Sequence, residues 1–459
     1  MPEREDQLTL HLDLTGEGGR RIQLMRALRD AIRSGRLAPD TRLPPYRVLA
    51  GDLGVAKNTV AGAYAELVAE GWLTAQQGSG TRVAQRTTAP EPGAVRSRPE
   101  PDRIRHDLRP SSPTAAAFPR TAWLASARRA LTAAPNDAFG VADPRGRPEL
   151  RAALVDHLAR ARGVRADAGR IVVCAGFGHA LQLLADVLPG PVAVEAYGLG
   201  FHRDVVHGAG HRTVPIPIDA DGAQVGELAA TDVTTVLLTP AHQYPTGGPL
   251  HARRRTAVVD WARSTGGWIL EDDYDGEFRY DRQPIGALQG LDPEHVVYLG
   301  STSKSLSPAL RLGWMVLPAA LVDDVLAAKG TREIWTGVTD QLTLADFLRS
   351  GAYSRHLRRA RLSYQRRRAA LVAALADRAP HVRVSGIAAG LHAVLELPDD
   401  TEEATVRAAR SAGVALDGLR DYRHPDASTP PRDGLVIGYG TPPGHAFPAA
   451  LGALCAAIR

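Results

Sequence analysis

The segment Ser301–Trp314 reads STSKSLSPALRLGW and is the most informative stretch of the chain. It places hydroxyl groups, the amine of Lys304 and the guanidinium of Arg311 in one short loop. Lysine is otherwise rare, because Lys57 and Lys329 are the only others and arginine supplies the remaining positive charge. A lysine amine can lose its proton and attack a carbonyl, whereas a guanidinium stays protonated. The loop therefore suits an aldehyde that carries a phosphate, which describes pyridoxal 5'-phosphate (PLP); a solvated lysine in a Ser-rich turn is the alternative.

Apolar segments of strand length alternate with helical patterns in the sequence before this loop. The alternation predicts an α/β fold in which a mostly parallel sheet is covered by helices. In open sheets of this kind, ligands bind beyond the carboxyl ends of the strands. The predicted strands cover residues 171–175, 192–195, 233–239, 268–272 and 296–300, with helices such as 179–188 and 253–264 between them.

Candidate binding residues follow two of these strands. Phe177 and Gly178 open a helix whose free backbone N–H groups can bind a phosphate, although a plain glycine turn is equally consistent with the sequence. Asp272 and Tyr274 come at the end of another strand, and side-chain alternation places them on one face. A carboxylate can hold a pyridine nitrogen protonated, and a tyrosine hydroxyl can bond the phenolic oxygen of the same ring. A solvated edge is the alternative for the three acids Glu271–Asp273.

Composition limits the class of protein. The length of 459 residues predicts about two to four domains. The acidic N-terminus has no apolar signal core and no run of about 18 apolar residues occurs, so we expect neither export nor a membrane span. The two cysteines, Cys174 and Cys455, fit a reduced compartment, and the protein is expected in the cytoplasm. Their spacing is not of the metal-binding type, and no metal site is predicted.

Charge and composition divide the chain into two unlike parts. Residues 20–86 hold eleven Lys and Arg against five Asp and Glu, a net charge of +6, whereas the whole chain carries only +5. An excess of this kind permits nucleic-acid binding but does not establish it. The stretch 86–106 is rich in proline and charge and lacks apolar periodicity, as linkers do. The predicted organisation is therefore a domain over 1–85, a linker over 86–106 and a large domain over 107–459.

The first domain is predicted to contain three short helices followed by a hairpin. The expected elements are a helix marked by Ile22, Met25, Leu28 and Ile32, a second from about 43 to 53, a third over 56–70, and strands at 72–74 and 81–83. Val60, Ala63, Tyr64 and Leu67 form an apolar stripe along the third helix. This order predicts a winged helix-turn-helix, whose recognition helix enters the DNA major groove. A helical bundle for protein docking is the alternative.

The segment LPPYRVLAGDLGVAKNTVAGAYAELVAEGWLTAQQGSGTRVA resembles the GntR family over about residues 20–84. The resemblance implies a double-stranded DNA operator as partner. By position, the implied DNA-binding residues are Arg47 at a phosphate, Lys57, Asn58 and Thr59 at or beside bases, Tyr64, and Gly80 in the wing. Two departures occur: Tyr46 replaces a small residue, and Ala56 stands where Ser or Thr often caps the recognition helix, which weakens that cap by about 1 kcal/mol.

Residues from about 107 to the end resemble the fold-type-I aminotransferases through YPTG, EDDYDGEF and STSKSLSPALRLGW. A GntR-type domain joined to such a domain is typical of the MocR subfamily of transcriptional regulators. The resemblance implies PLP as cofactor and a head-to-tail, domain-swapped homodimer. It also implies residue roles. Lys304 would form the Schiff base; the implied cofactor-binding residues are Asp272, Tyr274, Ser301, Ser303, Arg311, Phe177, Gly178, Tyr244 and Tyr197, with His202 the alternative to Tyr197 for stacking on the ring.

Departures from the aminotransferase pattern bear on function. Aminotransferases usually carry Asn where Tyr244 stands, and an arginine that grips the substrate carboxylate where this chain has Val436 or Ile437. Arg423 or Arg432 from the neighbouring loop could substitute.

The leading hypothesis is a transcriptional regulator that senses PLP, or an amino compound reacting with it, to control vitamin B6 or amino-acid metabolism genes. The alternatives are an active aminotransferase with a tethered DNA-binding module and a catalytically dead dimerisation platform; a single half-transamination would suit a sensor.

Overall fold

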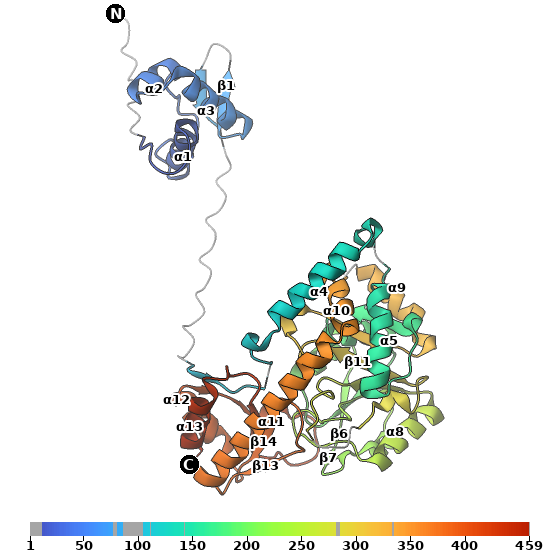
Figure 1. The fold of residues 1–459 in the computed structure, drawn as a ribbon. Coiled ribbons are helices and arrows are strands. Elements are labelled where there is room, and N and C mark those ends of the chain that lie inside the picture. Colours follow the sequence, from blue (N-terminus) through green and yellow to red (C-terminus); the bar gives the residue numbers. More distant parts are fainter. Residues whose placement is uncertain are drawn as a thin grey trace, which may run out of the picture. The chain divides into compact units, whose positions relative to one another are not determined.

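The computed structural model describes residues 12–76, 80–85, 104–110, 112–141, 143–280, 285–332 and 335–458. The chain divides into two compact units, Met1–Glu100 and Pro101–Arg459, called here the N-terminal and C-terminal units (Figure 1). Most of the predicted linker 86–106 and the predicted wing turn at 78–79 lie outside the described residues. The exact domain boundaries therefore stay a prediction.

The N-terminal unit has the predicted order of three helices and a hairpin. These are α1 (Arg20–Arg33), α2 (Tyr46–Asp52), α3 (Lys57–Ala69) and the antiparallel strands β1 (Leu73–Gln76) and β2 (Gly80–Val83). The stripe predicted on α3 is buried in full. The helix predicted from Ile22, Met25, Leu28 and Ile32 is present as α1, and its buried face runs through Leu24, Met25 and Leu28, whereas Ile22 is 50% exposed.

A seven-stranded sheet forms the centre of the C-terminal unit (Figure 1). Its order is β4-β12-β11-β10-β9-β5-β6, and only β12 runs antiparallel to its neighbours. The bounds are β4 (Ile171–Cys174), β5 (Val192–Glu195), β6 (Thr213–Ile216), β9 (Thr235–Leu238), β10 (Trp268–Asp272), β11 (Val296–Ser301) and β12 (Gly313–Val316). All five predicted strands are present within a few residues of their predicted ends.

Helices cover both faces of this sheet because its strands are apolar on both faces. Alternating residues of β4 show how: Val172 packs in a cluster with α6, whereas Val173 packs in the cluster that contains α5. The helices are α4 (Arg120–Ala133), α5 (Pro148–Arg162), α6 (Phe177–Val187), α7 (Gly200–Gly208), α8 (Ala252–Thr265), α9 (Val322–Arg332), α10 (Val338–Arg349) and α11 (Ala352–Arg378). None of the described helices is long and apolar enough to pass through a membrane.

A smaller antiparallel sheet of order β13-β14-β17-β16 completes the C-terminal unit. Its strands are β13 (Arg383–Ser385), β14 (His392–Glu396), β16 (Asp417–Gly418) and β17 (Gly434–Gly438), accompanied by α12 (Glu402–Ser411) and α13 (Phe447–Ala457). Two-residue strands pair elsewhere: β3 (His106–Asp107) with β15 (Val414–Ala415), and β7 (Ile218–Asp219) with β8 (Gly222–Ala223). The turn after β9 packs on the loop before β14, since Ile387 donates its backbone N–H to Gly247 O at 2.8 Å.

Candidate functional site

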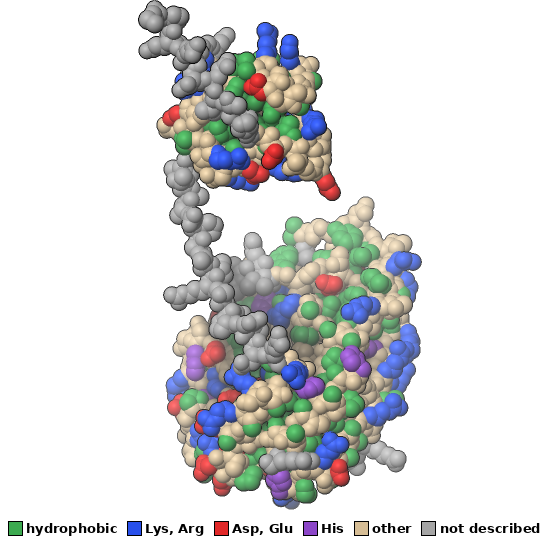
Figure 2. All heavy atoms as spheres, turned by 90° about the vertical axis from the view of Figure 1, so that its left-hand side faces the viewer, with side chains coloured by type: hydrophobic (Ala, Val, Ile, Leu, Met, Phe, Trp, Pro, Cys, Tyr) green, Lys and Arg blue, Asp and Glu red, His purple; other side chains and the backbone are tan. Residues whose placement is uncertain are grey.

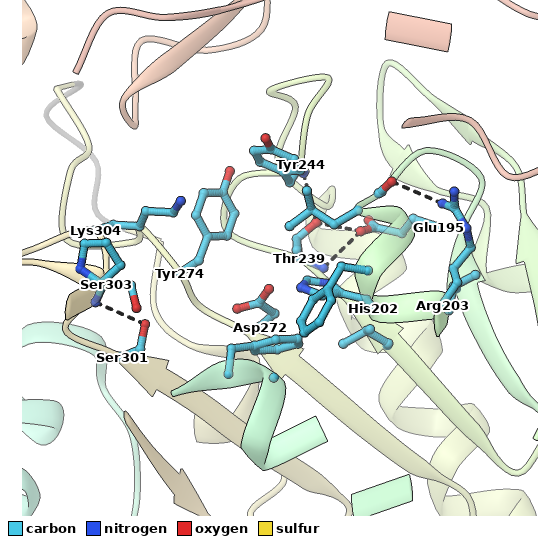
Figure 3. Close-up of a pocket in the computed structure, with 18 of the residues that line it drawn as sticks. Glu195, His202, Arg203, Thr239, Tyr244, Asp272, Tyr274, Ser301, Ser303 and Lys304 are labelled. Carbon is cyan, nitrogen blue, oxygen red and sulfur yellow. Dashed lines mark hydrogen bonds between the residues drawn. The ribbon is translucent and has the colours of Figure 1, made fainter. Parts of the chain in front are cut away.

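A cavity of about 270 Å³ lies where the carboxyl ends of β5, β9, β10 and β11 meet the start of α6 (Figure 3). This is the position expected for a ligand in a sheet of this kind. The structure brings together all ten residues predicted for the cofactor site. They are Lys304, Asp272, Tyr274, Ser301, Ser303, Arg311, Phe177, Gly178, Tyr244 and Tyr197, and all of them line the cavity.

Lys304 lies in the loop after β11, and its amine points toward Tyr274 in Figure 3. Burial lowers the pKa of this amine, although the nearby carboxylates of Asp275 and Asp272 oppose the shift. A lowered pKa increases the fraction of neutral amine, which is the form that attacks a carbonyl. The electrostatic setting of Lys304 therefore suits a nucleophile.

Asp272 ends β10 with its carboxyl group buried at the cavity wall. Burial, followed by repulsion from Asp273, raises the pKa of Asp272 well above its usual range. Within the described part of the chain, no donor is hydrogen-bonded to its side chain. A buried carboxyl group of this kind is stabilised in its charged form by a cationic N–H partner, and a protonated pyridine nitrogen fits that requirement.

The opposite end of the cavity is suited to a phosphate. No side chain caps α6, so the backbone N–H groups of its first turn are available to an anion. Arg311 lies close by, since a Cβ added to Gly176 would be 3.6 Å from its guanidinium. Among the described residues, no carboxylate pairs with Arg311. Ser301 and Ser303 add hydroxyl groups on the same wall, so the residues present fit PLP as a whole.

Aromatic rings line the remaining walls. Tyr197 and Tyr244 are buried in a cluster that also contains Tyr422 and Val436. The Tyr197 hydroxyl accepts a hydrogen bond from the backbone N–H of Arg432 at 2.9 Å. His202 packs against Phe177 with ring centroids 4.4 Å apart, and burial lowers its pKa to about 3. Tyr197 and His202 both reach the cavity, so the choice of stacking residue stays a prediction.

The predicted DNA-binding residues of the N-terminal unit lie at two helix starts and in the wing. Arg47 is exposed on α2, and Lys57 and Asn58 are exposed in the first turn of α3, with Thr59 half-buried beside them. Ala56 precedes α3 without a side-chain cap, as predicted. Gly80 opens β2 with a φ of +86°, a backbone conformation that favours glycine.

Tyr64 is placed differently from the other residues of this set. Its side chain is 6% exposed in the core of the N-terminal unit, and its hydroxyl donates to Pro44 O at 3.0 Å. The ring and the hydroxyl are therefore already used inside the unit. This corrects the expectation that Tyr64 belongs to the DNA-contacting surface, since the same apolar stripe that buries α3 also buries this residue.

Family comparisons agree with both units. Residues 21–83 match the model for bacterial regulatory proteins of the gntR family, and residues 111–425 match aminotransferase class I and II. The probable rhizopine catabolism regulatory protein MocR of Rhizobium meliloti is 33% identical, over 91% of this chain and 89% of its own length. The HTH-type pyridoxine biosynthesis transcriptional regulator PdxR of Corynebacterium glutamicum is 32% identical, over 91% of both chains. This chain belongs to the MocR subfamily of GntR-type transcriptional regulators.

Solved structures show the fold of the C-terminal unit of this MocR-type regulator. An archaeal alanine:glyoxylate aminotransferase superposes with a TM-score of 0.70 at 21% identity, over 76% of this chain and 90% of that chain. The kynurenine aminotransferase of Pyrococcus horikoshii gives a TM-score of 0.70 at 24% identity, over 78% and 91%. The predicted fold class, a winged helix-turn-helix joined to a fold-type-I aminotransferase-like domain, is therefore confirmed.

Sequence reasoning missed two charged residues in the cavity of the MocR-type regulator. Glu195 ends β5 and accepts hydrogen bonds from the backbone N–H and the hydroxyl of Thr239, at 3.1 and 2.5 Å. Burial raises its pKa to about 7. Arg203 on α7 donates from Nη1 to Gly198 O at 3.1 Å. The rule that found Asp272 at a strand end would also have found Glu195, whereas no strand pattern marks Arg203.

The arginine expected of an aminotransferase on β17 is replaced by buried aliphatic side chains, Val436 and Ile437. Arg423 donates to Ala427 O at 2.5 Å and to Thr429 O at 2.7 Å, so its guanidinium is bound to its own loop. Arg432 is exposed, with its guanidinium 5.8 Å from the centroid of the Tyr197 ring. Neither loop arginine lines the cavity, and neither replaces the missing group there.

One buried group beside the cavity has metal-ligand chemistry. His242, Asp275 and His392 each bring a ligand-type atom within 4.8 Å of the other two. Hydrogen bonds already account for this grouping, since His242 Nδ1 lies 2.8 Å from Asp275 Oδ2 and His392 Nε2 lies 3.1 Å from Pro245 O. We therefore do not assign a metal to it.

Proposed function

We propose that this MocR-type regulator binds PLP through Lys304 and that PLP occupancy changes its affinity for an operator in double-stranded DNA. One observation carries the proposal: the Lys304 amine shares a cavity with the buried carboxyl of Asp272 and the guanidinium of Arg311. An aldehyde, a pyridine nitrogen and a phosphate are the three groups of PLP that these side chains would bind. When bound, PLP supplies an aldehyde for attachment and a ring that accepts electrons.

Each residue then has a distinct role in holding the cofactor. Lys304 provides the attachment point, and the charges of Asp275 and Asp272 act on its amine. Asp272 would bind the pyridine N–H, and Tyr274 would donate to the phenolic oxygen. The phosphate would be bound by Arg311 and by the first turn of α6. These roles agree with the sequence prediction but remain proposals.

The signal is proposed to be PLP itself, and the target genes those of vitamin B6 metabolism. The apolar residues on β17 support this, because a bidentate guanidinium for an amino-acid carboxylate is absent at Val436 and Ile437. The name of the Corynebacterium glutamicum relative, a pyridoxine biosynthesis regulator, points to the same class of signal. An amino compound that reacts with bound PLP is the variant of this proposal.

Arg203 favours a second candidate, an active aminotransferase with a tethered DNA-binding unit. Its guanidinium lines the cavity and forms no ion pair within the described part of the chain. It could therefore bind a carboxylate from a position that the family pattern does not use. Sustained conversion of an amino donor and a keto acid would favour this candidate, whereas a single half-reaction would not.

We further propose that the regulator is a cytoplasmic homodimer in which each N-terminal unit contacts the C-terminal unit of its partner. Support comes from apolar side chains exposed around α4. Leu124 is 67% exposed, Phe139 53% and Val141 97%. Exposed apolar residues that gather in one region of a soluble chain commonly mark an interface. A second copy of the chain would cover them.

The test combines absorption and DNA binding. PLP is added to cofactor-free protein, the visible spectrum is recorded, and affinity for operator DNA is measured with and without PLP. We expect a new visible band in the wild type and none in Lys304→Ala. The affinity of Lys304→Ala for operator DNA should be the same with and without PLP. Lys57→Ala is the matched control, because this exposed lysine lies outside the cavity: it should keep the band and weaken DNA binding. DNA affinity that responds only to an added amino acid would contradict PLP as the signal.

A further inference from the structure

His242 and Asp275 form a buried pair in contact with Tyr274. His242 belongs to the turn after β9 and Asp275 follows β10, and both side chains are only 2% exposed. His242 Nδ1 lies 2.8 Å from Asp275 Oδ2 and 3.0 Å from the Tyr274 hydroxyl oxygen. A single ring nitrogen therefore meets a carboxylate and a phenol whose own ring lines the cofactor cavity.

The chemistry of the three groups fixes the direction of their hydrogen bonds. An ionised carboxylate can only accept, so Asp275 requires a proton on His242 Nδ1. That N–H also reaches the Tyr274 oxygen, which then accepts from it. Because Nδ1 has no free lone pair in this tautomer, the proton of Tyr274 cannot point back at His242. It is available instead to an acceptor in the cavity that Tyr274 and Lys304 share.

The Tyr274 hydroxyl keeps its proton in this setting. Burial, followed by the negative charge of Asp275, raises its pKa well above the usual range. Tyr274 is thus a donor and not a phenolate, which is what a bond to the phenolic oxygen of a bound ring requires.

The backbone of Gly390 packs directly against the pair. A Cβ on Gly390 would overlap Asp275 Oδ2 and lie 2.6 Å from His242 Cε1, and Gly390 has a φ of +68°. On the other side, the His392 ring packs 5.1 Å from His242, and burial lowers the pKa of His392 to about 3. His392 Nε2 lies 3.1 Å from Pro245 O, so a neutral His392 uses its one N–H on that carbonyl and does not compete with His242 for the carboxylate of Asp275.

We propose that His242 and Asp275 are positioning residues: Asp275 holds the proton on His242 Nδ1, and His242 holds the Tyr274 hydroxyl as a donor into the cofactor cavity. The inference rests on the proposed binding of PLP. It adds two residues to the cofactor site that do not line the main cavity themselves. His242 acts through Tyr274, whereas the charge of Asp275 also acts on the amine of Lys304.

The experiment measures the dissociation constant of PLP and the visible absorption maximum of the bound cofactor. The variants are His242→Gln, Asp275→Asn, Tyr274→Phe and the double variant His242→Gln/Tyr274→Phe. Each single variant should weaken PLP binding roughly three- to tenfold, the loss expected for one hydrogen bond, and should move the maximum in the same direction as Tyr274→Phe. The double variant should be no weaker than Tyr274→Phe alone, because residues that act through a shared partner are not additive.

His157→Gln is the matched control. His157 is another buried histidine paired with a carboxylate, 2.6 Å from Glu277, and it does not line the cavity. It should leave the dissociation constant of PLP and the absorption maximum unchanged.

Two results would overturn the inference while PLP binding stands: normal PLP affinity in both His242→Gln and Asp275→Asn, or losses that add in the double variant. A wild type without a visible band would instead overturn the proposed function, and the positioning pair with it. Asp275→Asn nearly preserves side-chain shape, so it tests the pair even where His242→Gln is poorly folded.

Discussion

The two units of this regulator use charge in opposite ways. Ion pairs of the N-terminal unit lie at its surface: Arg21 and Glu66 are separated by 3.1 Å with side chains 55% and 44% exposed. Figure 2 shows Lys and Arg side chains interspersed with Asp and Glu on the visible face of that unit. In the C-terminal unit, Arg162 and Asp273 meet at 2.6 Å with side chains only 2% and 1% exposed.

The difference follows from what each unit has to bind. Exposed charges cost little to maintain and can exchange counterions for the phosphates of DNA. Buried charges require partners, and their pKa values respond strongly to each neighbour. The chemistry of the C-terminal unit is therefore concentrated in one cavity with buried charged groups, whereas recognition by the N-terminal unit is spread over an exposed surface. Four experiments test this difference between the two units.

Arg162→Met is expected to have the largest effect. Arg162 pairs with the carboxylate of Asp273 and donates to Ile285 O. Its replacement by methionine leaves the buried carboxylate of Asp273 without this partner. Breaking a buried pair in this way costs about 3–5 kcal/mol. We expect denaturant unfolding of the C-terminal unit to shift by this amount while operator binding by the remaining folded protein is unchanged. Arg21→Met, at an exposed pair, is the control and should shift unfolding by less than about 1 kcal/mol.

Lys57→Ala tests the exposed surface of the N-terminal unit. Loss of one phosphate or base contact should weaken DNA binding by about 1–3 kcal/mol and, if Lys57 contacts a phosphate, reduce the salt slope by about 1. The measurement is operator affinity across a series of salt concentrations. PLP affinity in the same series should change far less, because the cavity charges are largely shielded from solvent ions. An unchanged salt slope would show that Lys57 does not contact a phosphate.

The sequence predicted five of the seven strands of the central sheet and ten of the residues that line the cavity, because strand patterns and the motifs that follow strands are local in the sequence. Apolar runs mark strands, and the polar residue that follows each strand must lie at the same sheet edge, as Asp272 does. The features that the sequence did not predict depend on contacts between segments distant in the sequence. Ile22 has the right helical spacing but faces solvent, since the packing of α1 against α3 decides which stripe is buried.

The same limit explains the residues that were missed. His242 and Asp275 stand in the segments after β9 and β10, and their pairing depends on how these two segments fold at the sheet edge. Arg203 lines the cavity because the first turn of α7 lies beside it, which no periodicity reveals. Charged groups become functional here through burial, and burial is a property of the packed chain.

Tyr64→Phe distinguishes a core residue from a DNA contact. The structure predicts a loss of about 1 kcal/mol in the stability of the N-terminal unit, because the hydrogen bond to Pro44 O disappears while the ring stays packed. Operator affinity of the folded protein should be unchanged. Thermal unfolding and DNA titration measure the two quantities separately. A loss of operator affinity without a loss of stability of the N-terminal unit would mean that Tyr64 contacts DNA.

Glu195→Gln should give the smallest and most pH-dependent effect. Burial raises the pKa of Glu195 from 4.5 to about 7, so the folded chain binds this proton more tightly than the unfolded chain does. By linkage, the wild type loses stability as pH rises from about 4.5 to about 7 and loses no more above that range. Glutamine can still accept from Thr239 and carries no charge, so the variant should be more stable than the wild type at pH 8, with no such gain at pH 4.5. The measurement is the difference in unfolding free energy between Glu195→Gln and the wild type, obtained by denaturant unfolding at pH 8 and at pH 4.5. An equal effect at both pH values would mean that Glu195 stays ionised in the fold. The cavity would then shield its charged groups less than the comparison with the N-terminal unit requires.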